Sequence, residues 1–107
     1  MTSNRRVFVQ CRFTRGGFGH ERVFWIPTPD GQGEYRGLAY IAYCYRSNRK
    51  PLSPDEPPPG ESINGLIIGR WISESDDGIV TIQVPDGELC EVSSSIIQEG
   101  KDVPVGS

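Results

Sequence analysis

Residues 65–74 read Gly-Leu-Ile-Ile-Gly-Arg-Trp-Ile-Ser-Glu, and this stretch predicts a long β-strand with a bend in it. Successive side chains of a strand point to opposite faces, which places Leu66 and Ile68 on one face and Trp71 on the other. Gly69 lies in the middle of the run. A glycine inside a strand is typical of a bulge or a sharp bend, which a small, tightly curled barrel requires.

The residues that follow predict a hairpin and a closing turn. Strands are expected at 79–84 and 88–92, because apolar and polar residues alternate there with a period of two. The Pro-Asp-Gly sequence at 85–87 between them is a tight-turn signal. Three serines at 93–95 then favour a turn or a single 3₁₀ turn, after which Ile96 and its neighbour close the core.

The N-terminal part predicts a second hairpin. Residues 6–14 alternate, with Val7, Val9, Cys11 and Phe13 on a core face and Phe8, Gln10, Arg12 and Thr14 on a wet face. Three glycines within residues 16–19 suit a flexible turn. The following strand, 21–26, is apolar on both faces, so it is either a central strand or part of an interface.

The middle of the chain is less regular. Residues 35–46 fit both a helical stripe and a strand, and the four tyrosines and the missing capping signal favour the strand. Residues 47–64 form an irregular loop with five prolines. Such a segment is either a docking peptide for an SH3 or WW domain or a stiff connection, and its position inside the domain favours the connection.

The C-terminal stretch 65–98 resembles the hairpin half of SH3-like small barrels, which include the KOW and Tudor groups. The resemblance is carried by Gly-Leu-Ile-Ile-Gly-Arg-Trp-Ile at 65–72, Asp-Gly-Ile-Val-Thr-Ile-Gln-Val at 77–84, Pro-Asp-Gly-Glu at 85–88 and Val-Ser-Ser-Ser-Ile at 92–96. It covers about a third of the chain and implies an all-β fold, a small SH3-like or partly open β-barrel of five to six strands. The resemblance does not assign the residues of a Tudor-type aromatic cage to positions of this sequence.

Length and composition are those of one small domain, 1–107, with a loosely held tail from about residue 100. The longest apolar stretch, 38–45, is far too short to span a membrane, and the start of the chain has no apolar run typical of a signal peptide. The three cysteines, Cys11, Cys44 and Cys90, lie in apolar runs without metal-site spacing. We therefore expect buried free thiols, no metal, no cofactor and a cytoplasmic location.

The formal charge of −3 is divided unevenly along the chain. Residues 1–50 hold nine basic and three acidic residues, whereas residues 51–107 hold two basic and eleven acidic ones. Either the two halves interleave and their charges complement each other locally, or the protein has one basic and one acidic face. The pI of about 5.1 speaks against a dedicated nucleic-acid-binding domain.

One group of residues in the first third combines basic and aromatic side chains in the way that a binding surface requires. Arginines neutralise phosphates and aromatic rings stack on bases. The candidate binding residues are Phe8, Arg12, Arg15, Phe18, Arg22, Phe24 and Trp25.

No catalytic constellation is recognised, and His20 in the glycine-rich turn is interpreted as an exposed turn residue. The first hypothesis is a non-enzymatic protein-interaction module that docks on a partner protein or associates with itself, based on the doubly apolar strand and the charge split. The alternative is a barrel that binds single-stranded nucleic acid. A small enzyme with a site in the turn at 16–20 is a weaker third.

Overall fold

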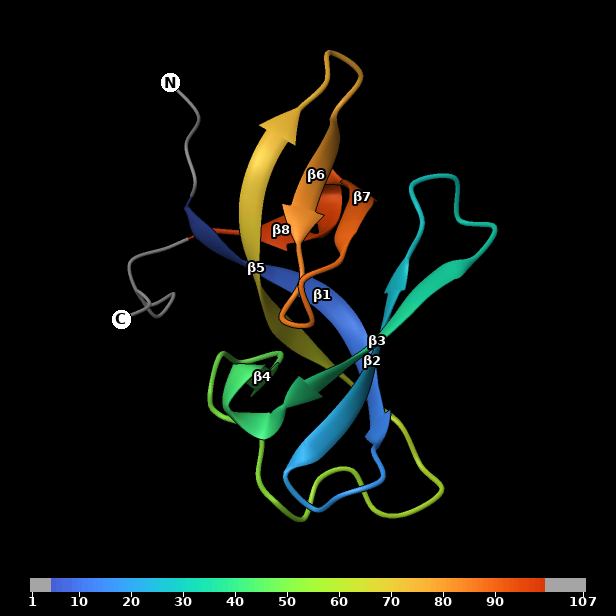
Figure 1. Ribbon diagram of the computed structural model, residues 1–107, viewed down its shortest axis with the longest axis vertical. Helices are drawn as coiled ribbons and strands as arrows, with labels where there is room; N and C mark the ends of the chain where they lie inside the picture. The colour runs from blue at the N-terminus through green and yellow to red at the C-terminus, as the bar shows by residue number, and fades with distance from the viewer. Residues whose placement is uncertain (1–4, 100–107) are drawn as a thin grey trace.

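The computed structural model describes residues 5–99, and these form one antiparallel β-sheet that curls into a nearly closed small barrel (Figure 1). Six strands follow one another around the sheet in the order β3-β2-β1-β5-β6-β7, while β4 pairs with β5 and β8 pairs with β1. The strands are β1 (Arg6–Arg15), β2 (Glu21–Pro27), β3 (Glu34–Tyr40), β4 (Cys44–Arg46), β5 (Ile63–Glu74), β6 (Ile79–Gln83), β7 (Leu89–Ser93) and β8 (Ile97–Gln98).

The all-β prediction is therefore confirmed, and the barrel agrees in general shape with an SH3-like fold. The tail expected from about residue 100 lies outside the described residues. Within residues 5–99, no helix is long and apolar enough to cross a membrane.

The two long strands, β1 and β5, produce the curvature. They pair with each other over eight residues, and each one changes its other neighbour along its length: β1 pairs with β8 near its start and with β2 near its end. Likewise, β5 pairs first with β4 and then with β6. The register with β6 shifts between Trp71 and Ser73, which places a bulge a few residues beyond Gly69, whereas the pairing of Gly69 with Val7 is regular.

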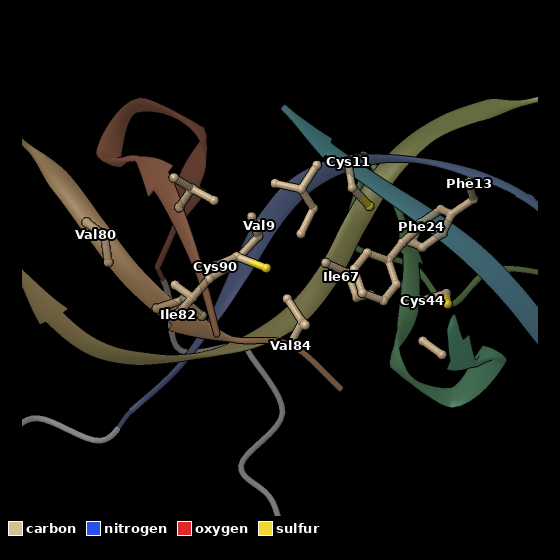
Figure 2. Packing of buried hydrophobic residues seen from close by; sticks show 14 of the residues in the cluster. Val9, Cys11, Phe13, Phe24, Cys44, Ile67, Val80, Ile82, Val84 and Cys90 are labelled. Carbon is tan, nitrogen blue, oxygen red and sulfur yellow. The ribbon is translucent and has the colours of Figure 1, made fainter. Parts of the chain in front are cut away.

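The inward-facing residues of these strands form the core, as the alternation predicted (Figure 2). The four residues assigned to the core face of β1 all belong to it, and residues from β2, β5, β6 and β7 pack against them from across the barrel. The main buried set is Val7, Val9, Cys11, Phe13, Phe24, Ile26, Ile67, Val80, Ile82, Val84, Cys90 and Val92.

A second, smaller cluster lies on the outer side of the sheet and corrects the prediction for Phe8. Phe8 is fully buried there with Leu66 and Ile68, and the ring of Tyr45 packs edge-on against it, with the ring centres 5.1 Å apart. The guanidinium of Arg49 covers the Phe8 ring at 5.2 Å. As the alternation predicted, the Phe8 side chain points to the face of β1 opposite the main core. It is nevertheless buried, because β4 and the turn after it cover this part of β1 and exclude water.

The stretch 35–46 is a strand only at its two ends. The chain is extended through β3, forms a single 3₁₀ turn, η1 (Ile41–Tyr43), and continues as the short strand β4. The amide of Ile41 donates to the carbonyl of His20 at 2.8 Å. This bond fixes the point where the chain leaves the edge of the sheet. The 3₁₀ turn expected in the serine run is present as η2 (Ser94–Ile96).

The apolar residues on both faces of β2 are explained by its position between β1 and β3. Phe24 and Ile26 lie in the main core, and Val23 on the opposite face is also buried. Of the two interpretations of this strand, the structure supports the central strand. The doubly apolar pattern therefore gives no support to the interaction hypothesis.

Candidate binding surface

The structure separates the seven predicted binding residues into buried and accessible ones. Phe8, Arg22 and Phe24 are buried, so a ligand at the surface does not reach their side chains. Arg12, Arg15 and Trp25 are half-buried, whereas Phe18 is exposed.

Arg22 is the one buried polar or charged residue among residues 5–99, and it serves as an internal clamp. Its guanidinium donates four hydrogen bonds to carbonyl oxygens: to Glu56 at 2.7 Å, to Gly19 and Glu21 at 2.8 Å, and to Pro54 at 2.9 Å. Burial lowers the pKa of Arg22, and the nearby charge of Arg15 lowers it further. The alternation along β2 places Arg22 on the same face as Phe24. The sequence pattern therefore contained a signal that the Arg22 side chain points into the barrel.

The same clamp holds the proline-rich loop against the barrel, where it passes beside the turn between β1 and β2 (Figure 1). Arg15 donates to the carbonyl of Pro57 at 2.7 Å, and Arg46 forms an ion pair with Glu56 at 2.7 Å. Leu52 in the loop is buried in the core. The loop is thus packed against the barrel by these contacts.

Trp25 and Arg12 lie together on the outer face of β1, β2 and β3. The guanidinium carbon of Arg12 lies 4.9 Å from the centre of the Trp25 ring, and that of Arg36 from β3 lies at 5.5 Å. The indole N–H donates to Thr14 at 3.1 Å. Arg12 also forms an ion pair with Glu34 at 3.1 Å. Both groups therefore already have partners within the protein.

Exposed aromatic and aliphatic side chains gather beside this face, at the end of β3. Phe18 stacks on His20 with the ring centres 6.2 Å apart, and His20 stacks on Tyr40 at 5.6 Å. Phe18 is 67% exposed, Tyr40 61%, Leu38 46% and Tyr43 36%. We call these five residues, His20 included, the aromatic patch. Sequence reasoning found only Phe18 as a binding residue, although alternation along β3 puts Leu38 and Tyr40 on one face.

A pocket of about 210 Å³ opens within the aromatic patch and carries negative charge. Leu38, Tyr40 and Tyr43 form apolar walls, and the acidic residues Glu21 and Asp86 also line it. Glu21 belongs to β2, whereas Asp86 comes from the turn between β6 and β7. No local sequence pattern predicts this pocket, because its lining residues come from distant parts of the chain. The first and the last of them, Glu21 and Asp86, are 65 residues apart.

Three of the nine basic residues in the first half of the chain form ion pairs among residues 5–99. Arg5 pairs with Glu99 at 2.6 Å and joins the two ends of the described chain, and the pairs of Arg12 and Arg46 are given above. The ion pairs of Arg5 and Arg46 support the interpretation in which the halves interleave. Within residues 5–99, Arg6, Arg36 and Arg70 have no carboxylate within ion-pairing distance.

The three cysteines are buried and unpaired. Burial raises the pKa of Cys11, raises that of Cys44 to about 12, and raises that of Cys90 to about 11. The thiolate is the nucleophilic form of cysteine, and at neutral pH these side chains are thiols. Among residues 5–99 no three His, Cys, Asp or Glu side chains are grouped as a metal site requires.

Comparisons of the chain with protein-family models, with curated proteins and with solved structures found no match.

Proposed function

We propose that the protein is a non-enzymatic interaction module that binds a protein partner through the aromatic patch. One observation carries the proposal: of the five large hydrophobic side chains that are exposed among residues 5–99, Phe18, Leu38, Tyr40 and Tyr43 belong to this patch. Small soluble domains rarely expose a contiguous apolar surface of this kind without a partner for it. Leu89, the fifth, lies on β7.

The charges around the patch favour a protein partner over nucleic acid. Glu21 and Asp86 border the apolar pocket, and their carboxylates repel phosphates. A polypeptide that inserts an apolar side chain and places a lysine or arginine beside these two carboxylates complements the pocket. In addition, β3 is an edge strand of the described sheet, where a partner strand has access to backbone groups.

The resemblance of the chain to SH3-like barrels supports the same class of function. We propose that the barrel belongs with the SH3-like barrels, as the resemblance of residues 65–98 to the KOW and Tudor groups implies. The three unpaired cysteines suit a reducing compartment such as the cytoplasm.

Selection from a displayed library of random peptides tests the proposal, because it requires no candidate partner. We expect enriched peptides to combine aliphatic or aromatic residues with a lysine or arginine. Tyr40→Arg should abolish their binding, because it adds a positive charge and removes an exposed ring. Leu89→Arg is the matched control, since Leu89 is 59% exposed and lies outside the patch. Sedimentation of the protein alone over a wide concentration range shows whether a second copy is the partner.

Two results would overturn the proposal. One is the absence of both peptide enrichment and self-association. The other is binding that Tyr40→Arg and Leu89→Arg leave equally intact, because the binding surface would then lie elsewhere.

A second candidate is the binding of single-stranded nucleic acid. It is favoured by the stacked, exposed rings of Phe18, His20 and Tyr40 and by arginines without carboxylate partners on the described part of the chain. Fluorescence anisotropy with labelled single-stranded RNA and DNA at several salt concentrations decides between the two candidates. Micromolar binding that weakens steeply with salt would favour nucleic acid. No binding even at low salt would leave the protein partner.

A further inference from the structure

Two arginines without acidic partners lie opposite each other on the outer side of the barrel. Arg6 on β1 and Arg70 on β5 are direct cross-strand neighbours, and Gln83 on β6 is the next residue in the same row. The Cβ atoms of such neighbours are about 4.5–5.5 Å apart. Among residues 5–99 neither arginine has an ion pair or a hydrogen bond to a side chain.

The two arginines line a pocket of about 280 Å³. Tyr43 from η1 and Gln83 form further walls, and residues of the turn between β6 and β7 also line the pocket. No carboxylate of the described chain lines it. Asp86 belongs to that turn, but it lies on the border of the neighbouring acidic pocket and accepts a hydrogen bond from the amide of Glu88 at 3.0 Å.

Like charges directly opposite each other in a sheet destabilise it. Arg6 and Arg70 are only half-buried, but within the described chain no negative group offsets their repulsion. An anion bound between Arg6 and Arg70 would replace their mutual repulsion by attraction of both guanidinium groups to the anion. Arginine is well suited to phosphate, because its planar guanidinium offers two parallel N–H donors to two oxygen atoms. A dianion neutralises both arginines at once, which a carboxylate or chloride does not.

We propose that this pocket is a binding site for a phosphate monoester dianion held between Arg6 and Arg70. Gln83 and Tyr43 also line the pocket and supply further polar groups; the amide nitrogen of Gln83 donates to the carbonyl of Gly87 at 3.3 Å and keeps a second N–H. The volume is near the lower limit of small-molecule pockets, so it takes the phosphate group and a small part of the attached molecule. The site adjoins the aromatic patch through Tyr43, but it does not depend on a partner at that patch.

Titration of the ¹⁵N-labelled protein with inorganic phosphate, followed by NMR, tests the site. We expect saturable shifts at Gly69, Arg70 and Gln83, and an affinity at least tenfold lower in Arg6→Gln and in Arg70→Gln. Arg70→Lys keeps the charge and should retain part of the affinity. Arg36→Gln is the matched control, because Arg36 also has no carboxylate partner but lies outside the pocket. Circular dichroism of each variant verifies that it is folded.

Two further ligands identify the source of the phosphate. Phosphoserine in a short peptide represents a modified protein, and a nucleoside monophosphate represents a metabolite; tighter binding of either than of inorganic phosphate assigns the source. Shifts that sodium chloride reproduces at equal ionic strength, or that persist in Arg70→Gln, would overturn the proposal. Tyr40→Arg, which tests the aromatic patch, should leave the phosphate shifts unchanged, so the two proposals fail separately.

Discussion

The clamp made by Arg22 allows a quantitative prediction. Each hydrogen bond from a charged donor contributes about 1.5–3 kcal/mol net, so four of them contribute roughly 6–12 kcal/mol. The burial of the cation costs several kcal/mol and offsets a large part of this. Arg22→Met keeps much of the side-chain volume but removes all four donors. We expect it to lower the free energy of unfolding by about 3–5 kcal/mol, because four carbonyl oxygens lose a charged donor while the desolvation cost of the cation is relieved.

That loss is large for a domain of this size, whose free energy of unfolding is typically about 5–15 kcal/mol. Each kcal/mol lowers the Tm by about 4–8 °C, so a decrease of at least roughly 12 °C is expected. Arg22→Lys should lie between Arg22→Met and the wild type, because one ammonium group does not reach four carbonyls in the directions that a guanidinium does. Urea and thermal unfolding, followed by the fluorescence of Trp25 and Trp71, measure these differences.

Arg36→Met is the control, because Arg36 is exposed and makes no ion pair among the described residues. Its effect should stay below about 1 kcal/mol. Hydrogen exchange adds a local measurement: in Arg22→Met the amides of Leu52 and Glu56 in the proline-rich loop should lose protection before those of β1. Equal stability of Arg22→Met and the wild type would refute the reasoning, because desolvation of the cation would then cancel the four bonds.

Two further predictions concern the core and the thiols. Gly37→Ala should lower the free energy of unfolding by about 1–3 kcal/mol in chemical denaturation, because the added methyl group would overlap the Phe24 ring. Gly19→Ala is the control and should have little effect, because the space around Gly19 is open. Equal losses in the two variants would contradict this packing. Stability should be fully present below pH 9 and decrease above it, since burial raises the pKa of Cys44 to about 12 and of Cys90 to about 11 relative to the unfolded chain. Cys90→Ala should weaken that alkaline decrease, and an unchanged pH profile would show that another group causes it.

Local pattern was enough to predict most of the strands and the core face of β1. Alternation identifies a half-buried strand because side chains of a strand point to opposite faces regardless of what covers them. The Pro-Asp-Gly turn and the serine turn were found for a similar reason, since their backbone preferences are set within a few residues. The stretch 35–46 was only partly predicted, because the break at η1 depends on a hydrogen bond to His20, which lies in a different turn.

The accessibility of individual side chains was decided by tertiary structure. Phe8 is buried because β4, which is 36 residues further along the chain, and its following turn cover the outer face of β1. Arg22 was expected at the surface on the basis of residue type, yet carbonyls of two separate loops surround it. Pairing of β1 with β5 sets Arg6 opposite Arg70. The sequence by itself thus determined which residues form strands and which faces are apolar, because those properties are local. Which face is covered, and which charges meet, was decided by strand order and register, because these depend on residues far apart in the chain.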